Sequence, residues 1–247
     1  MTQPTVTIPC CSAPAPSAVA PTVAGLVKMS TVDWPGKLAA VVFLQGCPWR
    51  CTYCHNDAIL DPRAPGIMSW TAVTDFLARR RGLLDGVIFS GGEPTLSTAL
   101  PAAIDQVRGL GFQVGLHTGG PWPRRLERLL ADGKVDWVGL DIKHLPEKYG
   151  DVTGVASSGR AAWRSLEAVL ASGVDHEVRT TVDPTVHSSA DIIDLGTRLR
   201  VMGVQRHVLQ EARPDGAAAN HESAFDGWSL SDTIPTRELP WADRRAA

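Results

Sequence analysis

The chain has 247 residues, of which 44% are hydrophobic and 20% charged, and its formal net charge at pH 7 is -2. This composition is typical of a soluble globular protein with one large or two small domains. The near-neutral charge gives no reason to expect a nucleic-acid partner or attraction to an acidic membrane. The sequence shows no apolar run of membrane-spanning length and no secretory signal pattern, so we expect a cytoplasmic protein with reduced thiols.

The first stretch, residues 1–24, is rich in Pro, Ala, Thr, Ser and Val and has neither a helical nor a strand period. Such a composition predicts a disordered extension. Cys10 and Cys11 fall within it, and two adjacent cysteines are poorly placed to share one cluster with a distant loop. We interpret them as incidental, with a redox or metal role as the alternative.

From Gly25 onward, strand and helix patterns alternate along the chain. The sequence predicts strands at 39–44, 86–89, 112–116, 135–140, 177–182 and 207–209, and helices at 70–81, 98–110, 123–132, 160–172 and 189–202. The run 39–44 is continuously apolar, as in a strand buried on both faces, and Ser69 is suited to cap the helix that follows. The alternation predicts an α/β fold of about six parallel β-α units, fewer than the eight of a closed barrel.

The tail beyond Pro214 becomes polar and loop-like, with isolated tryptophans at Trp228 and Trp241. We therefore divide the chain into an extension (1–24), an α/β domain (25–213) and a C-terminal tail (214–247). The sequence leaves open whether this tail packs on the domain.

Three cysteines follow the first predicted strand in a C-x-x-x-C-x-x-C pattern, namely Cys47, Cys51 and Cys54. A structural zinc site needs four ligands, and His55 directly follows Cys54, so both would struggle to reach one ion. A cubane iron–sulfur cluster needs one outer ligand per iron, so three thiolates would leave one iron open. Three cysteines also cannot pair fully in disulfides, and free cysteines seldom cluster for packing alone. The pattern favours a cluster over zinc, and zinc over packing.

Unusual residues also follow the next three predicted strands, at Ser90–Pro94, His117–Gly120 and Asp141–Lys143. Chemistry in parallel β-α folds gathers at the carboxyl ends of the strands, so these segments should share one rim. Gly91 and Gly92 would let the backbone approach a ligand, although a glycine pair is more often a simple turn. Asp141 and Lys143 should point the same way, either toward a ligand or into a weak salt bridge.

The segment Cys47-x-x-x-Cys51-x-Tyr53-Cys54, with an aromatic residue before the third cysteine, resembles the signature of the radical S-adenosylmethionine (SAM) enzymes. His55-Asn56 and Ser30-Thr31-Val32-Asp33-Trp34-Pro35-Gly36 more narrowly resemble the glycyl-radical-enzyme activases, above all those of anaerobic ribonucleoside-triphosphate reductases. The resemblance covers roughly Gly25 to Arg213. It implies a partial (β/α)6 barrel of the radical SAM type, with one [4Fe-4S] cluster and S-adenosyl-L-methionine as cofactors.

The resemblance also implies a reaction and a set of site residues. A reduced flavodoxin- or ferredoxin-type protein would supply one electron, S-adenosylmethionine would give methionine and a 5'-deoxyadenosyl radical, and the radical would take hydrogen from a glycine Cα of the reductase. No catalytic residue is expected beyond the cluster and cofactor. The implied metal ligands are Cys47, Cys51 and Cys54, and the implied cofactor-binding residues are Tyr53, Cys54, His55, Gly91, Gly92, Glu93, Thr118, Asp141, Lys143 and Arg179. Arg179 would alternatively form a structural pair, for example with Glu93.

Some positions depart from the activase pattern. His117 stands where activases similar to pyruvate formate-lyase activating enzyme tend to have the aspartate of a cation site. Trp34 replaces a glycine and Lys37-Leu38 replaces an arginine, which we interpret as marks of a specialised partner surface. Two other functions stay open: a radical SAM enzyme for a small molecule, similar to 7-carboxy-7-deazaguanine synthases, and a non-catalytic metal-binding module. Asp33-x-Pro35-Gly36 and His55-Asn56 favour the activase.

Overall fold

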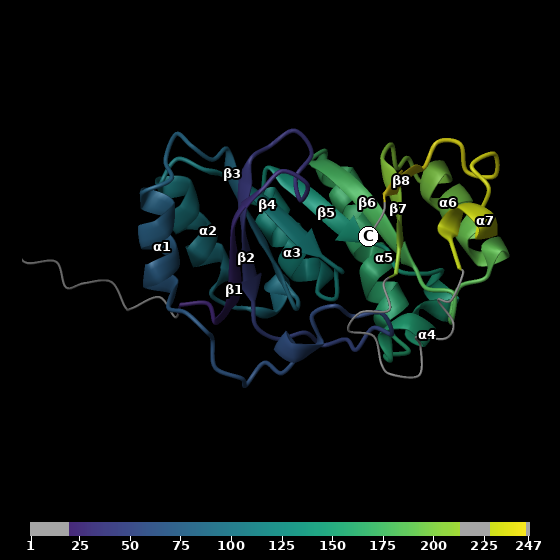
Figure 1. The fold of residues 1–247 in the computed structure, drawn as a ribbon, viewed down its shortest axis with the longest axis horizontal. Coiled ribbons are helices and arrows are strands. Elements are labelled where there is room, and N and C mark those ends of the chain that lie inside the picture. The colour runs from purple at the N-terminus through teal and green to yellow at the C-terminus, as the bar shows by residue number, and fades with distance from the viewer. Residues whose placement is uncertain (1–19, 213–227, 246–247) are drawn as a thin grey trace, which may run out of the picture.

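An eight-stranded sheet forms the centre of a computed structural model that describes residues 20–212 and 228–245. The strands are β1 (Val23–Ser30), β2 (Ala39–Leu44), β3 (Gly86–Gly91), β4 (Gln113–Thr118), β5 (Trp137–Asp141), β6 (Asp175–Val182), β7 (His207–Glu211) and β8 (Asp243–Arg245). They lie in chain order across the sheet (Figure 1). β1 is antiparallel to β2, and every later neighbouring pair is parallel. The strands β2 to β7 therefore form the predicted β-α units.

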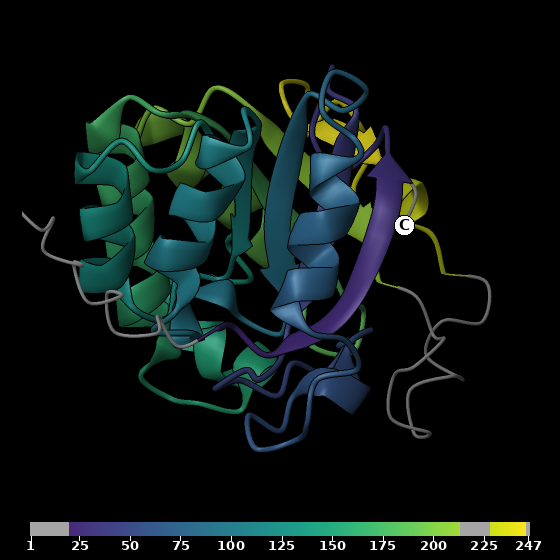
Figure 2. The ribbon, with the colours of Figure 1, turned by 90° about the vertical axis from the view of Figure 1, so that its left-hand side faces the viewer.

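The helices that connect the parallel strands cover one face of the sheet (Figure 2). The α-helices are α1 (Trp70–Ala78), α2 (Leu100–Gly109), α3 (Pro123–Ala131), α4 (Tyr149–Thr153), α5 (Ser158–Ser172), α6 (Ser189–Val201) and α7 (Leu230–Thr233). The opposite face lines the interior of the partial barrel. None of the helices in the described ranges is long and apolar enough to cross a membrane.

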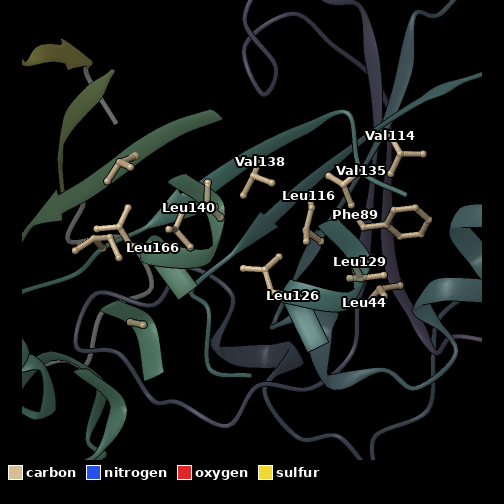
Figure 3. Close-up of a cluster of buried hydrophobic side chains, with 14 of the residues drawn as sticks. Leu44, Phe89, Val114, Leu116, Leu126, Leu129, Val135, Val138, Leu140 and Leu166 are labelled. Carbon is tan, nitrogen blue, oxygen red and sulfur yellow. The ribbon is translucent and has the colours of Figure 1, made fainter. Parts of the chain in front are cut away.

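The main hydrophobic core lies between the sheet and these helices (Figure 3). Successive side chains of a strand point to opposite faces, so Val42 and Leu44 of β2 enter this core while Val41 points to the interior. Leu126 of α3 and Leu166 of α5 pack on the same side. The continuous apolar run of β2 is thus explained by burial on both faces, as the sequence predicted.

A smaller apolar cluster fills the barrel interior around Trp34 and Trp137. Trp34 comes from the β1–β2 turn, is 4% exposed and stacks on Trp137 with ring centroids 5.6 Å apart. A Cβ added at Gly86 or Gly115 would lie 2.8 or 3.0 Å from the Trp34 ring, so both glycines make room for it. The interpretation of Trp34 as a partner-surface residue is therefore wrong, because its apolar ring is buried against the strands.

Several predicted elements match the observed ones closely. β2 has the predicted bounds, and Ser69 caps α1 by accepting a hydrogen bond from the Ala72 amide at 3.1 Å. α1 ends at Ala78 and not at Arg81. β1 begins at Val23, inside the stretch assigned to the extension, whereas Cys10 and Cys11 lie outside the described residues.

The sequence analysis missed β1, α4, α7 and β8, of which the last three are short. Within the described part of the tail, β8 pairs with β7, and Leu230, Ile234 and Leu239 are buried in the main core. The tail therefore packs on the domain and is not loop alone. Tertiary contacts stabilise these elements, and such contacts leave no periodic signal in a few residues.

We expect Trp34→Ala to lower the free energy of unfolding by about 3–5 kcal/mol, because it removes a buried ring and leaves a cavity. Urea denaturation with a tryptophan fluorescence signal measures the change. Val32→Ala, at a side chain that is 70% exposed, is the control and should stay within about 0.5 kcal/mol. Equal stability of both variants would contradict the interior position of Trp34.

Candidate functional site

A cavity of about 200 Å³, partly open to solvent, lies at the carboxyl ends of β2 to β6. Every residue that the sequence analysis assigned to the site lines this cavity: Cys47, Cys51, Tyr53, Cys54, His55, Gly91, Gly92, Glu93, Thr118, Asp141, Lys143 and Arg179. Further lining residues that were given no ligand role are Trp49, Asn56, Leu60, Ser90, His117, Gly119 and Thr181.

The loop that carries the three cysteines is held by backbone hydrogen bonds to its neighbours. The Arg50 amide donates to the Thr153 carbonyl and the Thr52 amide to the Val152 carbonyl, both at 3.0 Å. The Glu93 amide donates to the Gly46 carbonyl at 2.8 Å on the other side. The loop and α4 therefore lie together along the lower edge of the sheet in Figure 1. These partners satisfy an irregular backbone that has no ladder of its own.

Gly91 and Gly92 let the end of β3 pack directly against the cysteine loop. A Cβ on Gly91, whose φ is +118°, would lie 2.4 Å from the backbone nitrogen and oxygen of Leu44. A Cβ on Gly92 would lie 2.2 Å from the Gly46 carbonyl oxygen. The sequence analysis explained the glycines by access to a ligand, and the structure adds this close backbone contact as a second reason.

Glu93 joins the ends of β3 and β4. Its carboxylate is 2% exposed and accepts hydrogen bonds from the Thr118 hydroxyl at 2.7 Å and the Gly119 amide at 2.9 Å. Burial raises the pKa of Glu93, while hydrogen bonds from Thr95 and Thr118 act in the opposite direction. Glu93 and the Thr118 hydroxyl thus contact each other, and they shape the cavity wall.

Asp141 and Lys143 form an ion pair at the mouth of the cavity, with Nζ of Lys143 3.1 Å from Oδ2 of Asp141. The Lys143 amino group also lies 5.6 Å from the centre of the Tyr53 ring. Burial by itself would raise the pKa of Asp141, but Lys143 and Arg179 hold it below its ordinary value. The predicted common orientation of the two side chains is therefore present, and it places both charges beside the aromatic ring.

Arg179 is paired with Glu177, so the suggested pair with Glu93 is wrong. Its Nε donates to Oε1 of Glu177 at 2.9 Å, and its Nη2 donates to the Asp33 carbonyl at 3.2 Å. Arg179 lies on β6 opposite Asp141 of β5. The Glu93 carboxylate instead accepts a hydrogen bond from Thr118 at the end of β4. Arg179 therefore brings a positive charge to the inner wall of the cavity.

His117 occupies the interior next to Arg179. Its Nε2 lies 3.0 Å from the Asp33 carbonyl oxygen, and its ring meets Trp137 edge-on. Burial and the neighbouring Arg179 charge lower the pKa of His117 to about 4, so the ring is neutral at pH 7. Only a protonated Nε2 can donate to that carbonyl. His117 is thus an uncharged part of the barrel wall.

The three thiols fit an iron–sulfur cluster better than a single metal ion. All three are free, half-buried and line the same cavity. Burial raises the pKa of Cys47 to about 12 and also raises that of Cys51, so thiolates here need a positive group such as iron. In the described ranges, no three or more His, Cys, Asp or Glu side chains are placed so that they could hold one metal ion together. A cluster spreads its ligands over separate irons.

Glu177 is a buried charged residue that the sequence analysis did not single out. Its carboxylate is fully buried and forms ion pairs with Arg179, Arg206 and Arg245, the last from β8. The pattern Glu177-Val178-Arg179 on a predicted strand places both charges on one face and was an available signal. The two other arginines come from distant segments and left no such signal.

Comparisons with known proteins show the family to which this chain is similar. The chain matches the family model described as the Radical SAM superfamily over residues 41–195. A Methanocaldococcus jannaschii protein, described provisionally as a glycyl-radical enzyme activating enzyme, is 30% identical over 88% of this chain and 89% of its own length. The pyruvate formate-lyase-activating enzyme of Clostridium pasteurianum is 33% identical over 67% of this chain and 70% of its own.

A solved structure of Streptococcus suis SuiB bound to S-adenosylmethionine has a similar fold, with a TM-score of 0.59 at 14% identity. The match covers 82% of this chain and 48% of that chain, so this chain spans just under half of its length. The likeness bears out the predicted fold class.

We expect Glu177→Gln to lower the free energy of unfolding at pH 7 by about 3–5 kcal/mol, because it leaves Arg179 buried without its counter-charge. Burial by itself would raise the pKa of Glu177, but Arg179 and Arg245 hold it below its ordinary value of 4.5. Its stabilising effect is therefore present above that value and is lost as the pH falls through the lower folded-state pKa. Urea titrations at several pH values should show the gap between wild type and variant closing in acid.

Glu127→Gln is the matched control, since the ion pair of Glu127 with Arg164 is solvent-exposed. Such pairs contribute about 0–1 kcal/mol. If Glu177→Gln cost no more than this control at pH 7, the buried ion cluster would not support the site.

Proposed function

The chain belongs to the radical SAM superfamily, and from this premise we propose that it is a glycyl-radical-enzyme activase whose target is the anaerobic ribonucleoside-triphosphate reductase. Its cofactors are those of the family, a [4Fe-4S] cluster and S-adenosylmethionine. One observation carries the proposal: three free thiols share a single cavity with the Gly-Gly-Glu and Asp-x-Lys segments. When bound, the two cofactors supply reductive cleavage of S-adenosylmethionine and abstraction of a hydrogen atom from a glycine Cα.

The residues of the cavity divide into cluster ligands and groups that bind S-adenosylmethionine. Cys47, Cys51 and Cys54 would each hold one iron and leave the fourth open to the cofactor. The peptide groups of Gly91 and Gly92 face the cavity and suit the polar methionyl end. Asp141 and Lys143 present opposite charges at the mouth, which suit the charged and hydrogen-bonding groups of the cofactor. Tyr53 offers a ring face for the adenine.

Apolar side chains complete the wall and limit the access of water to the reacting atoms. Trp49 is 4% exposed, Tyr53 is 6% exposed and Leu60 is 8% exposed, and all three line the cavity. A reactive radical must be kept from solvent and held against one hydrogen atom of its target. The chain contributes position and shielding, and we assign no acid or base role to its side chains.

Two features support an activase over an enzyme for a small molecule. The similarity to the archaeal relative runs along nearly the whole of both chains. Within the Asp33-Trp34-Pro35-Gly36 segment, Trp34 is buried in the barrel interior and the Asp33 carbonyl accepts a hydrogen bond from Arg179. The reductase as target, a flavodoxin- or ferredoxin-type donor and a cytoplasmic location rest on the sequence resemblance and complete the proposal.

We expect the protein reconstituted anaerobically with iron and sulfide, and reduced with dithionite, to form 5'-deoxyadenosine from S-adenosylmethionine. Cys51→Ala should form less than about 1% of the wild-type product, because one cluster ligand is lost. Chromatography of the nucleoside products measures the yield. Val32→Ala, at an exposed position, is the control and should match wild type. A cluster-loaded wild type that forms no product would favour the non-catalytic metal module.

The target is tested by adding the anaerobic ribonucleoside-triphosphate reductase from the same organism to the reduced enzyme. We expect an electron paramagnetic resonance doublet of a glycyl radical, and its loss when the target glycine is changed to alanine. Pyruvate formate-lyase serves as the competing target. A radical on that enzyme alone would move the assignment to a different activase, while cleavage without any protein radical would favour a small-molecule substrate.

A further inference from the structure

Asp183 begins the loop between β6 and α6, and its side chain contacts the cysteine loop. The carboxylate is fully buried, and its Oδ2 accepts a hydrogen bond from the Thr52 hydroxyl at 2.6 Å. Thr52 lies between Cys51 and Cys54. The other oxygen, Oδ1, accepts from the amide and hydroxyl of Thr185 at 2.9 and 2.7 Å. Short hydrogen bonds to a buried carboxylate are strong and fix its orientation.

His187, four residues later, contacts the Lys143 segment. Its side chain is 6% exposed, and its Nε2 lies 2.8 Å from the Lys143 carbonyl oxygen. Its Nδ1 accepts a hydrogen bond from the Asp183 amide at 3.0 Å. Burial lowers the pKa of His187. Because Nδ1 accepts from the Asp183 amide, a hydrogen on Nε2 is available for donation to the Lys143 carbonyl oxygen. The ring also stacks on His144, with centroids 4.6 Å apart.

The two contacts are joined within the loop itself. The His187 amide donates to the Asp183 carbonyl at 2.9 Å, in addition to the bond from the Asp183 amide to the His187 ring. A displacement of one side chain therefore moves the other. The loop thus connects the segment that bears the cysteines with the segment that bears Lys143, which are far apart in the sequence.

We propose that Asp183 and His187 are positioning residues that hold the cysteine loop and Lys143 at a fixed separation, so that the cluster and S-adenosylmethionine bind at the correct distance from each other. The Asp183–Thr52 bond fixes the cysteine loop, and the His187–Lys143 bond fixes the segment that bears Lys143. This inference rests on the proposed function for the identity of the ligands. The hydrogen bonds on which it is based join protein groups only.

The first test compares Thr52→Val, which keeps the side-chain shape but removes the hydroxyl, with Thr52→Ser, which keeps the hydroxyl. We expect Thr52→Val to bind S-adenosylmethionine about fivefold more weakly, as the loss of one hydrogen bond would give, and Thr52→Ser to match wild type. Calorimetry on the cluster-loaded, unreduced protein measures this affinity. The paramagnetic resonance spectrum of the reduced cluster should also change less on cofactor addition in Thr52→Val.

The contact between His187 and Lys143 is tested with two variants. His187→Leu removes the donor to the Lys143 carbonyl, whereas the side-chain amide of His187→Gln can replace Nε2. We expect a higher KM for S-adenosylmethionine with a smaller change in kcat in His187→Leu, and recovery in His187→Gln. Thr74→Val is the matched control, because it removes a hydroxyl bond of similar length, 2.9 Å, on the exposed surface of α1. A loss of stability alone would lower the active fraction without changing KM or the spectrum.

Amide hydrogen exchange separates this inference from the proposed function, because it needs no activity. We expect the amides of residues 47–54 to exchange faster in metal-free Thr52→Val and His187→Leu than in wild type. In Thr74→Val their exchange should be unchanged. If wild type cleaved no S-adenosylmethionine but exchange changed as stated, the proposed function would fail and the positioning role would stand. Unchanged exchange, affinity and spectrum in Thr52→Val would overturn the positioning role.

Discussion

Charges that are buried on the inner face of the sheet must be paired, and this requirement organises the site. Glu177 lies at the centre of this arrangement, where Arg179 donates to it from the same strand and Arg245 reaches it from β8. Arg179 in turn lowers the pKa of Asp141, which is paired with Lys143. Opposite charges therefore continue from the last strand of the sheet to the mouth of the cavity. A consequence is that the C-terminal segment, which contains no predicted site residue, supports the electrostatics of the cavity wall.

The cysteine loop depends on a different kind of support. An irregular loop cannot fix three thiols unless its backbone groups find partners elsewhere. Here α4 accepts hydrogen bonds from Arg50 and Thr52, and the Gly-Gly-Glu segment packs so closely that a Cβ at Gly92 would overlap the Gly46 carbonyl. The glycines that line the cavity thus also pack against the cysteine loop. This double use explains in physical terms why glycines are required at a point where a turn alone would accept other residues.

Much of the fold was predictable from the sequence, because apolar runs and cap residues act locally. The bounds of β2, the Ser69 cap and the gathering of the rim segments follow from period and from the geometry of parallel strands. Long-range pairings were not predictable in this way. The pairing of Glu177 with Arg206 and Arg245, the interior position of Trp34 and the contact of Thr52 with Asp183 join residues far apart in the chain. No local pattern of residue types specifies which distant group will satisfy a buried charge or ring.

The two faces of the sheet bury different kinds of side chain. Burial between the sheet and the helices supplies the large apolar core, so the inner face can carry charges without loss of the fold. The inner face also carries the smaller apolar cluster around Trp34 and Trp137, which we call the plug. Trp137 in this plug stacks on Trp34, although its Nε1 is buried without a hydrogen-bond partner among the described residues. Such an unpaired donor costs about 1–3 kcal/mol, and the stacked rings must offset it. The Trp137 ring also contacts the His117 ring and lies 5.3 Å from the guanidinium carbon of Arg179, so it shields both groups from water, which would weaken the pairing of the buried charges.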